Sequence, residues 1–137
     1  MSEAHRSGCP INLSLEVIGD KWSLLIIRDM MFGDRRHFRA LLTESEEGIA
    51  SNILANRLRR LVDDGLLTRD DAGPGKRATY SLTEAAIELL PILNQLSYWG
   101  TRHRPSDPEL RARSEEMYAR GPEGWREYAD ELRERHL

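Results

Sequence analysis

The side chains best suited to specific hydrogen bonding recur along residues 51–64, which are predicted to form one helix. Asn52 and Asn56 are four residues apart and share one face of that helix, and Arg59 follows one turn later. An Asn amide can pair with the edge of adenine through two hydrogen bonds, and a guanidinium group can bind phosphate. This face could therefore read base pairs, or it could be an ordinary solvated helix surface.

The segments around this helix form a helix-turn-helix pattern. Leu54, Leu58 and Leu61 share the side opposite the asparagines, which predicts a buried apolar side. A shorter helix over residues 36–42 and a polar turn over residues 43–48 come before it. In this pattern the second helix is the one that enters the major groove of DNA.

Two short strands, residues 66–69 and 78–82, follow and flank a turn marked by Gly73-Pro74-Gly75. A hairpin in this position is a wing. Lys76 and Arg77 lie near its tip, where basic side chains can reach the minor groove or the DNA backbone. Two aspartates nearby weaken the positive field, so an ordinary charged turn is the alternative.

Helices are also predicted before and after these segments. A first helix begins at Pro10, and Asp20 caps a second, almost wholly apolar helix over residues 21–32. Thr83 can cap a long helix that runs to about Arg104, and Pro91 inside it should kink it or remove one backbone hydrogen bond. Its apolar residues cover more than one stripe, so it should either lie buried or pack on a second subunit, and its place at the end of the core favours the second subunit.

The length of 137 residues suits one compact winged helix-turn-helix domain with its dimerisation helices, residues 9–104. A flexible N-terminus (residues 1–8) precedes it, and a C-terminal helical extension (residues 105–137) follows. The net charge of −3 falls in the extension, which holds six Arg and nine Asp or Glu, so the rest of the chain is neutral overall. The composition is that of an ordinary soluble protein, and we expect a cytoplasmic one.

Motifs for catalysis and cofactor binding are missing from the sequence. It has no phosphate-binding loop, no Gly-rich dinucleotide turn and no nucleophile elbow. The four histidines lack the spacing of metal ligands. We therefore expect no enzyme activity, no cofactor and no metal.

Further motifs stand in a characteristic order along the chain. They are Cys9-Pro10-Ile11, Ile18-Gly19-Asp20-Lys21-Trp22, Arg36-His37-Phe38, Gly48-Ile49, Arg57-Leu58-Arg59, Tyr80-Ser81-Leu82-Thr83 and Leu90-Pro91-Ile92-Leu93 with Trp99. In this order, over about Cys9 to Trp99, they resemble the HxlR family of bacterial winged helix-turn-helix regulators.

The resemblance implies a mainly α fold with a small β-wing, dimeric through its N- and C-terminal helices. It also implies a DNA-binding transcription factor, and some family members sense oxidants through a cysteine near the N-terminus. Ala50 departs from the family, which usually has Ser where the reading helix starts, so the cap falls to Ser51 or is weaker.

Nine residues make up the expected DNA-binding surface. In chain order they are Arg36, His37, Ser51, Asn52, Asn56, Arg59, Arg60, Lys76 and Arg77. The asparagines would contact bases and Ser51 a base or a phosphate. The arginines of the reading helix and the two residues that open the shorter helix would contact phosphate.

Cys9, the only cysteine, is a candidate thiol sensor. It precedes Pro10 at the positive end of a helix, which favours the thiolate. Without a second cysteine in the chain, oxidation would give a Cys9–Cys9 bridge between subunits, a mixed disulfide or a sulfenic acid. The alternative is a small buried apolar residue.

Together these patterns predict a homodimeric regulator that binds double-stranded DNA at a pseudo-palindromic operator, with the reading helices about 34 Å apart. An effector or oxidation of Cys9 would change their spacing, and Trp22 and Trp99 are candidate walls of an effector pocket. The alternative is a winged-helix module for protein contact, with the acidic extension as its surface and no specific DNA binding.

Overall fold

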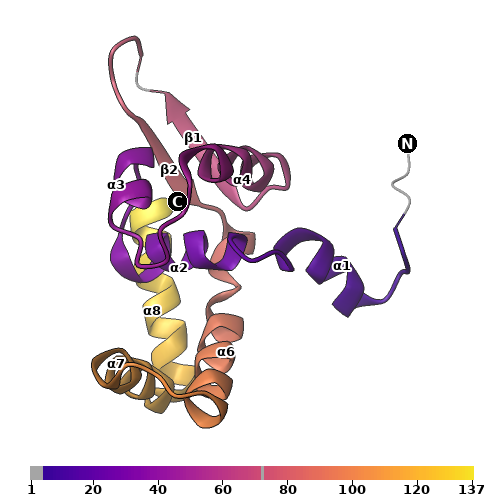
Figure 1. Ribbon diagram of the computed structural model, residues 1–137, viewed down its shortest axis with the longest axis vertical. Helices are drawn as coiled ribbons and strands as arrows, with labels where there is room; N and C mark the ends of the chain where they lie inside the picture. Colours follow the sequence, from indigo (N-terminus) through magenta and orange to yellow (C-terminus); the bar gives the residue numbers. More distant parts are fainter. Residues whose placement is uncertain (1–4, 72) are drawn as a thin grey trace. The chain divides into compact units, whose positions relative to one another are not determined.

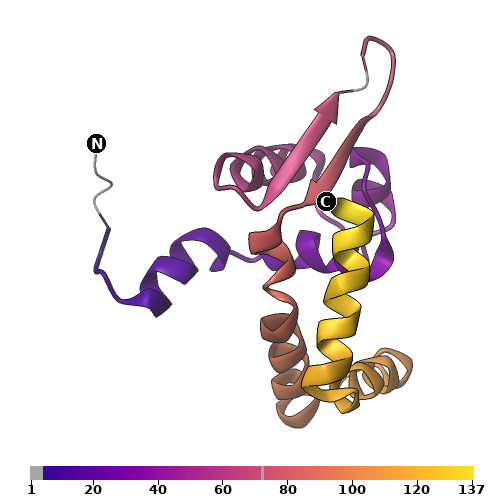
Figure 2. The same cartoon turned by 180° about the vertical axis from the view of Figure 1, so that it is seen from behind.

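The computed structural model describes residues 5–71 and 73–137. It divides the chain into two compact units, Met1–Ser81 and Leu82–Leu137. Figures 1 and 2 show the elements of both units from opposite sides. Within the described ranges, no helix is both long enough and apolar enough to cross a membrane.

The first unit contains a helix-turn-helix followed by a two-stranded hairpin. Its elements are α1 (Pro10–Ile18), α2 (Ser23–Gly33), α3 (Phe38–Thr43), α4 (Ser51–Asp63), β1 (Leu67–Asp71) and β2 (Ala78–Leu82), which ends at the boundary between the units. Their order confirms the predicted mainly α fold with a small β-wing.

Leucines at one-turn spacing bury one side of α4, as predicted. Leu54, Leu58 and Leu61 are each at most 1% exposed. Helix α3 and strand β1 pack against α4, and α2 packs against α3. Burial of one leucine side chain contributes about 2 kcal/mol, so the three leucines fix the rotation of α4 about its axis. The direction of its polar face is thereby fixed too.

An ion pair holds the turn between α3 and α4. Nη1 and Nη2 of Arg28 in α2 donate to Oε2 and Oε1 of Glu47, at 2.8 and 2.7 Å. These hydrogen bonds from Arg28 lower the pKa of Glu47. Because Glu47 lies just before α4, the pair fixes the chain where it enters that helix.

The ends of α2 differ slightly from the prediction. The helix begins at Ser23 rather than at residue 21, yet Asp20 still caps it by accepting the N–H groups of Trp22 and Ser23 at 2.8 and 2.9 Å. At its other end the left-handed cap is Asp34, with φ of 51°. Asp tolerates this conformation better than most residues with a side chain, because its short carboxylate can bond locally.

The second unit consists of four helices. They are α5 (Glu84–Ile87), α6 (Leu90–His103), α7 (Pro108–Ala119) and α8 (Gly121–His136). The prediction of one continuous helix over residues 83–104 was wrong, since α5 and α6 are separate. Pro91 lies in the first turn of α6, where a missing N–H breaks no helical hydrogen bond.

Both helices of the C-terminal extension pack against α6. Tyr98 of α6 stacks on Tyr118 of α7, with ring centroids 4.2 Å apart. Trp125 of α8 donates from its ring N–H to the carbonyl of Met117 at 2.8 Å. The extension is therefore part of the second compact unit.

The predicted flexible N-terminus, residues 1–8, lies partly outside the described residues. Within them, Oε1 of Glu16 in α1 lies 2.5 Å from Nδ1 of His5. Oε2 of Glu16 accepts the backbone N–H of Arg6 at 3.3 Å. These contacts link residues 5 and 6 to the first helix.

Candidate nucleic-acid interface

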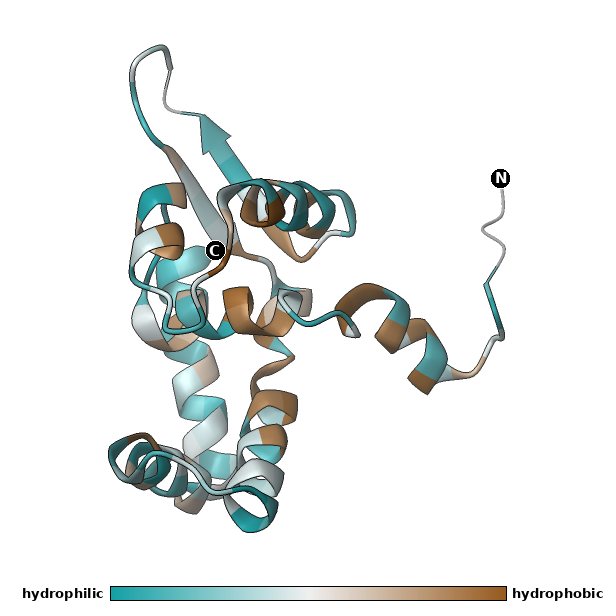
Figure 3. Ribbon diagram, viewed as in Figure 1, coloured by the Kyte–Doolittle hydropathy of each residue, from teal (hydrophilic) through white to brown (hydrophobic). Residues whose placement is uncertain are grey.

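The outer face of α4 presents the polar side chains that the helical spacing predicted. Ser51, Asn52, Arg59 and Arg60 are exposed, and Asn56 is half-buried. Figure 3 shows hydrophilic residues over this side of α4 and hydrophobic ones on the side that packs. A helix with this division can lie in a groove of DNA while its leucines stay in the core.

The wing carries two further basic residues. Its turn is closed by a hydrogen bond from the N–H of Lys76 to the carbonyl of Gly73, 3.1 Å long. Gly73 and Gly75 have φ of 102° and 77°, which a residue with a side chain rarely adopts. Lys76 and Arg77 follow on an exposed loop that projects beyond the helices of the first unit (Figures 1 and 2).

Four basic side chains on α4 and the wing have no ion pair or hydrogen bond among the described residues, and they are called uncommitted below. Among the described residues, no ion pair or hydrogen bond of the protein engages the side chains of Arg59, Arg60, Lys76 or Arg77. The nearby Arg69, in contrast, pairs with Asp71 through an Nε to Oδ1 contact of 2.7 Å. The four uncommitted cations can therefore meet phosphate without first breaking an internal pair.

Arg36 and His37 are placed differently from the other predicted site residues. Arg36 donates from Nε to the carbonyl of Tyr80 at 3.0 Å and from Nη2 to the hydroxyl of Ser81, and its own carbonyl accepts the N–H of Tyr80. His37 donates from Nδ1 to the carbonyl of Ala78 at 3.0 Å. Both side chains thus tie the start of α3 to strand β2 of the wing.

A network that the sequence did not indicate joins α4 to the start of α2. Arg57 donates from Nε to Oδ1 of Asp20 at 3.1 Å and from Nη1 to Oδ1 of Asn56 at 2.5 Å. Partial burial alone would raise the pKa of Asp20. Hydrogen bonds from the Ser23 hydroxyl, the Trp22 and Ser23 N–H groups and Arg57 outweigh it and lower that pKa to about 2.

Cys9 is exposed and immediately precedes α1. The backbone N–H groups of Asn12 and Ile11, in the first turn of that helix, lower the pKa of its thiol. The fold of a single chain therefore does not bury Cys9. The position favours the thiolate form, which is the reactive form of cysteine.

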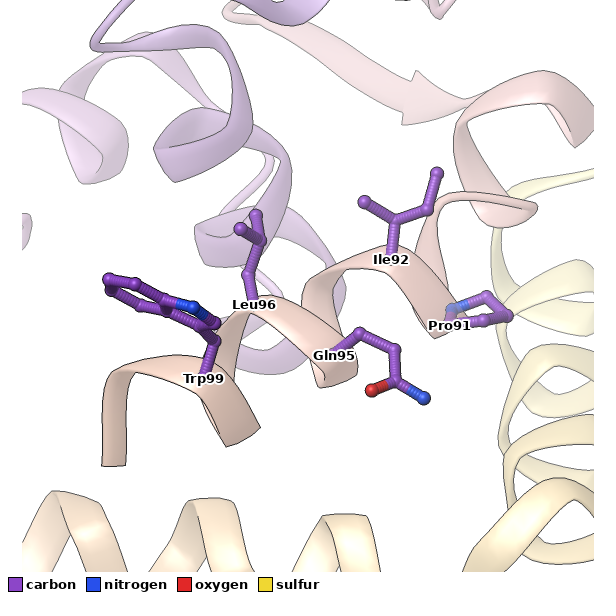
Figure 4. Close-up of a pocket in the computed structure, with 5 residues that line it drawn as sticks. All are labelled: Pro91, Ile92, Gln95, Leu96 and Trp99. Atoms are coloured by element: carbon purple, nitrogen blue, oxygen red, sulfur yellow. The ribbon is translucent and has the colours of Figure 1, made fainter. Parts of the chain in front are cut away.

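An open apolar groove runs along one face of α6. It is lined by Pro91, Ile92, Gln95, Leu96 and Trp99, with a volume of about 390 Å³ (Figure 4). All five side chains come from one helix, so the groove is a surface feature rather than an enclosed cavity. Among the described residues, no group of three or more His, Cys, Asp or Glu is arranged to hold a metal ion.

Comparison with known proteins agrees with this geometry. The HxlR-like helix-turn-helix family matches residues 17–108. The uncharacterized HTH-type transcriptional regulator Rv3095 of Mycobacterium tuberculosis is 37% identical over 114 residues, which cover 80% of this chain and 70% of that protein.

Two solved structures are also similar. PA1607, described as a candidate transcription factor, has a TM-score of 0.67 and 36% identity, covering 75% of this chain and 70% of that one. The redox regulator HypR in its oxidized form has a TM-score of 0.60 and 31% identity, covering 72% of this chain and 100% of that one. The family and these relatives share the winged helix-turn-helix described above.

Proposed function

Because the chain belongs to the HxlR-like helix-turn-helix family, we propose that it is a DNA-binding transcriptional regulator that acts as a homodimer on a pseudo-palindromic operator. The observation that carries this function is the set of polar and basic side chains on the outer face of α4 and on the wing, where no ion pair or hydrogen bond engages the four basic ones among the described residues. They lie on one unit, on the two elements that contact DNA in this fold.

The residues divide by role. Asn52 and Asn56 contact base edges, and Ser51 contacts a base or a phosphate at the start of α4. Arg59, Arg60, Lys76 and Arg77 contact phosphates and set the register. Arg36 and His37 act indirectly, because their side chains already bind β2 and hold the wing against α3.

Two exposed apolar helices support the homodimer. In α6, Ile92, Leu96 and Trp99 are 44%, 50% and 54% exposed, and in α1 no residue is buried while Ile11 is 72% exposed. Apolar surface of this kind gains most when a second subunit covers it. Two subunits joined in this way would place their α4 helices in successive major grooves, about 34 Å apart.

We expect sedimentation to show a dimer that Leu96→Asp dissociates, because an unpaired charge in an apolar interface costs several kcal/mol. Ala112→Asp, which adds the same charge on exposed α7, is the control and should stay dimeric. A wild-type protein that sediments as a monomer at micromolar concentration would contradict the homodimer.

Cys9 is the proposed switch. Its exposed thiol with a lowered pKa meets the requirements for reaction with an oxidant, and the similarity to the redox regulator HypR supports this role. Oxidation would form a Cys9–Cys9 bridge between subunits, a mixed disulfide with a small thiol or a sulfenic acid. A small-molecule effector is the other candidate trigger.

Selection of binding sites from random DNA duplexes tests the function. A regulator should enrich a symmetric motif with two half-sites one helical turn apart. Its affinity for that motif should also fall steeply as salt rises. A module for protein contact should enrich no motif, and that result would overturn the proposed function.

A further inference from the structure

The side chain of Asn56 is hydrogen-bonded to the next residue of α4. Its Oδ1 accepts a hydrogen bond from Nη1 of the adjacent Arg57, 2.5 Å away. The amide oxygen is therefore turned toward the guanidinium group, which fills one of its two lone-pair sites, and both donors of the amide NH₂ stay available. Asn52, one turn earlier on the same face, is exposed, and no hydrogen bond of its side chain to α4 or the wing is found in the described part of the first unit.

Arg57 is itself anchored at the start of α2. Its Nε donates to Oδ1 of Asp20 at 3.1 Å, and both groups are about four-fifths buried, with 22% and 20% of their side chains exposed. The same carboxylate also accepts the N–H groups of Trp22 and Ser23 and the hydroxyl of Ser23. Because these donors fix the carboxylate of Asp20, the ion pair restrains the guanidinium group of Arg57.

We propose that Arg57 is a positioning residue that sets which base Asn56 reads. This inference rests on the proposed function. An Asn that pairs with adenine uses its oxygen and its NH₂ together, accepting from N6 and donating to N7. Arg57 occupies one lone pair of the Asn56 oxygen and holds it on the guanidinium side, so Asn56 meets the bases mainly through its NH₂. It therefore favours guanine, whose N7 and O6 are adjacent acceptors, or O4 of thymine, over adenine, whose N7 acceptor lies beside the N6 donor.

Asn52 and Asn56 thus differ in what they read, although they are the same residue type on the same face. The free amide of Asn52 can pair with adenine through two hydrogen bonds. The restrained amide of Asn56 favours guanine or thymine. The position that each one reads is found by its own alanine variant, since Asn52→Ala and Asn56→Ala each remove the preference at one symmetric position of the half-site.

The test compares the selected motifs of wild-type protein and Arg57→Met, which keeps the length of the side chain and removes its donors. In wild-type protein, the position that depends on Asn56 should prefer guanine or thymine over adenine by about 5-fold or more in affinity. In Arg57→Met that position should change to adenine, while the position that depends on Asn52 stays the same. In the Asn56→Ala background, Arg57→Met should have no further effect on preference.

Two outcomes overturn the inference alone. One is a wild-type motif with adenine at the position that depends on Asn56, a result that requires no variant of Arg57 to fold. The other is a folded Arg57→Met protein whose preferences match those of wild type at every position. A wild-type protein that selects no motif instead overturns the proposed function, so the two failures are distinct.

Discussion

Nδ1 of His136 accepts a hydrogen bond from the backbone N–H of Leu82 at 3.0 Å, and both residues are buried. The contact joins the last turn of α8 to the residue where β2 ends. Nearby, Nε and Nη2 of Arg133 donate to the two carboxylate oxygens of Glu84, each at 2.8 Å. The end of the chain is thus built into the second unit, although it lies beyond the residues that match the family.

Replacing His136 should therefore destabilise the protein. His136→Phe fills much of the same space but removes the acceptor for the Leu82 N–H, and a buried unsatisfied donor costs about 1–3 kcal/mol. Urea denaturation should show this loss in the free energy of unfolding. Glu134→Ala, an exposed change on the same helix, should cost less than about 0.5 kcal/mol. Equal stability of His136→Phe and wild type would contradict this role of the imidazole.

Acid should remove the contribution that the charge of Asp20 makes to the stability of the fold. The pKa of this carboxyl is about 2 in the folded protein against an ordinary 3.8, so its charge stabilises the fold above about pH 4, and this stabilisation disappears as the pH falls through about 2. Asp20→Asn should lower the free energy of unfolding by roughly 1 kcal/mol at pH 7, after allowing for solvent screening of a partly exposed ion pair. Urea denaturation of both proteins at pH 7, 4 and 2 measures this difference in the free energy of unfolding. A deficit that is the same at all three pH values would rule out the charge as its cause.

The sequence predicted those features that depend on neighbours within one helix or turn. The leucines of α4 recur every turn, and the position of the polar face follows from them. The hairpin turn is marked by its two glycines, both of which have positive φ. Pro91 indicated the place where the predicted long helix divides, but not that α5 and α6 are separate.

The contacts that hold the site together join residues far apart in the chain. Arg57 and Asp20 are 37 positions apart, and helical periodicity assigns a residue to a face without naming its partner on another element. Arg36 shows the same limit of sequence analysis. A basic residue at the start of a helix has the same sequence signal whether it binds phosphate or, as here, strand β2.

The first turn of α4 can be strengthened at Ala50. This residue has the extended backbone of an N-cap, with φ of −74° and ψ of 147°, but offers no side-chain acceptor to the helix. Ala50→Ser should raise the free energy of unfolding by about 1 kcal/mol, because its hydroxyl can accept an N–H of the first turn. Ala55→Ser, on the exposed middle of the same helix, should lower it by about 0.5 kcal/mol. Thermal unfolding distinguishes the two, and a gain in both would contradict the capping explanation.

DNA binding should depend on the oxidation state of Cys9. Treatment of wild-type protein with a peroxide or a thiol-specific oxidant should change its affinity for the selected operator, and a reductant should restore it. Cys9→Ser should bind the operator with the affinity of the reduced protein, and the oxidant should not change that affinity. Electrophoretic mobility shifts measure the affinity, and non-reducing gels show whether a bridge between subunits has formed. If both proteins respond equally to oxidant, the thiol is not the switch.

The uncommitted cations of the wing should contribute through phosphate contacts alone. Arg77→Ala should lower affinity by a similar factor for every duplex and should reduce the slope of log K against log salt by about one unit. The double variant Lys76→Ala with Arg77→Ala should reduce it by about two. Arg113→Ala removes a comparably exposed arginine from α7 and should leave the slope unchanged. A slope unaffected by the wing variants would place these side chains away from the DNA backbone.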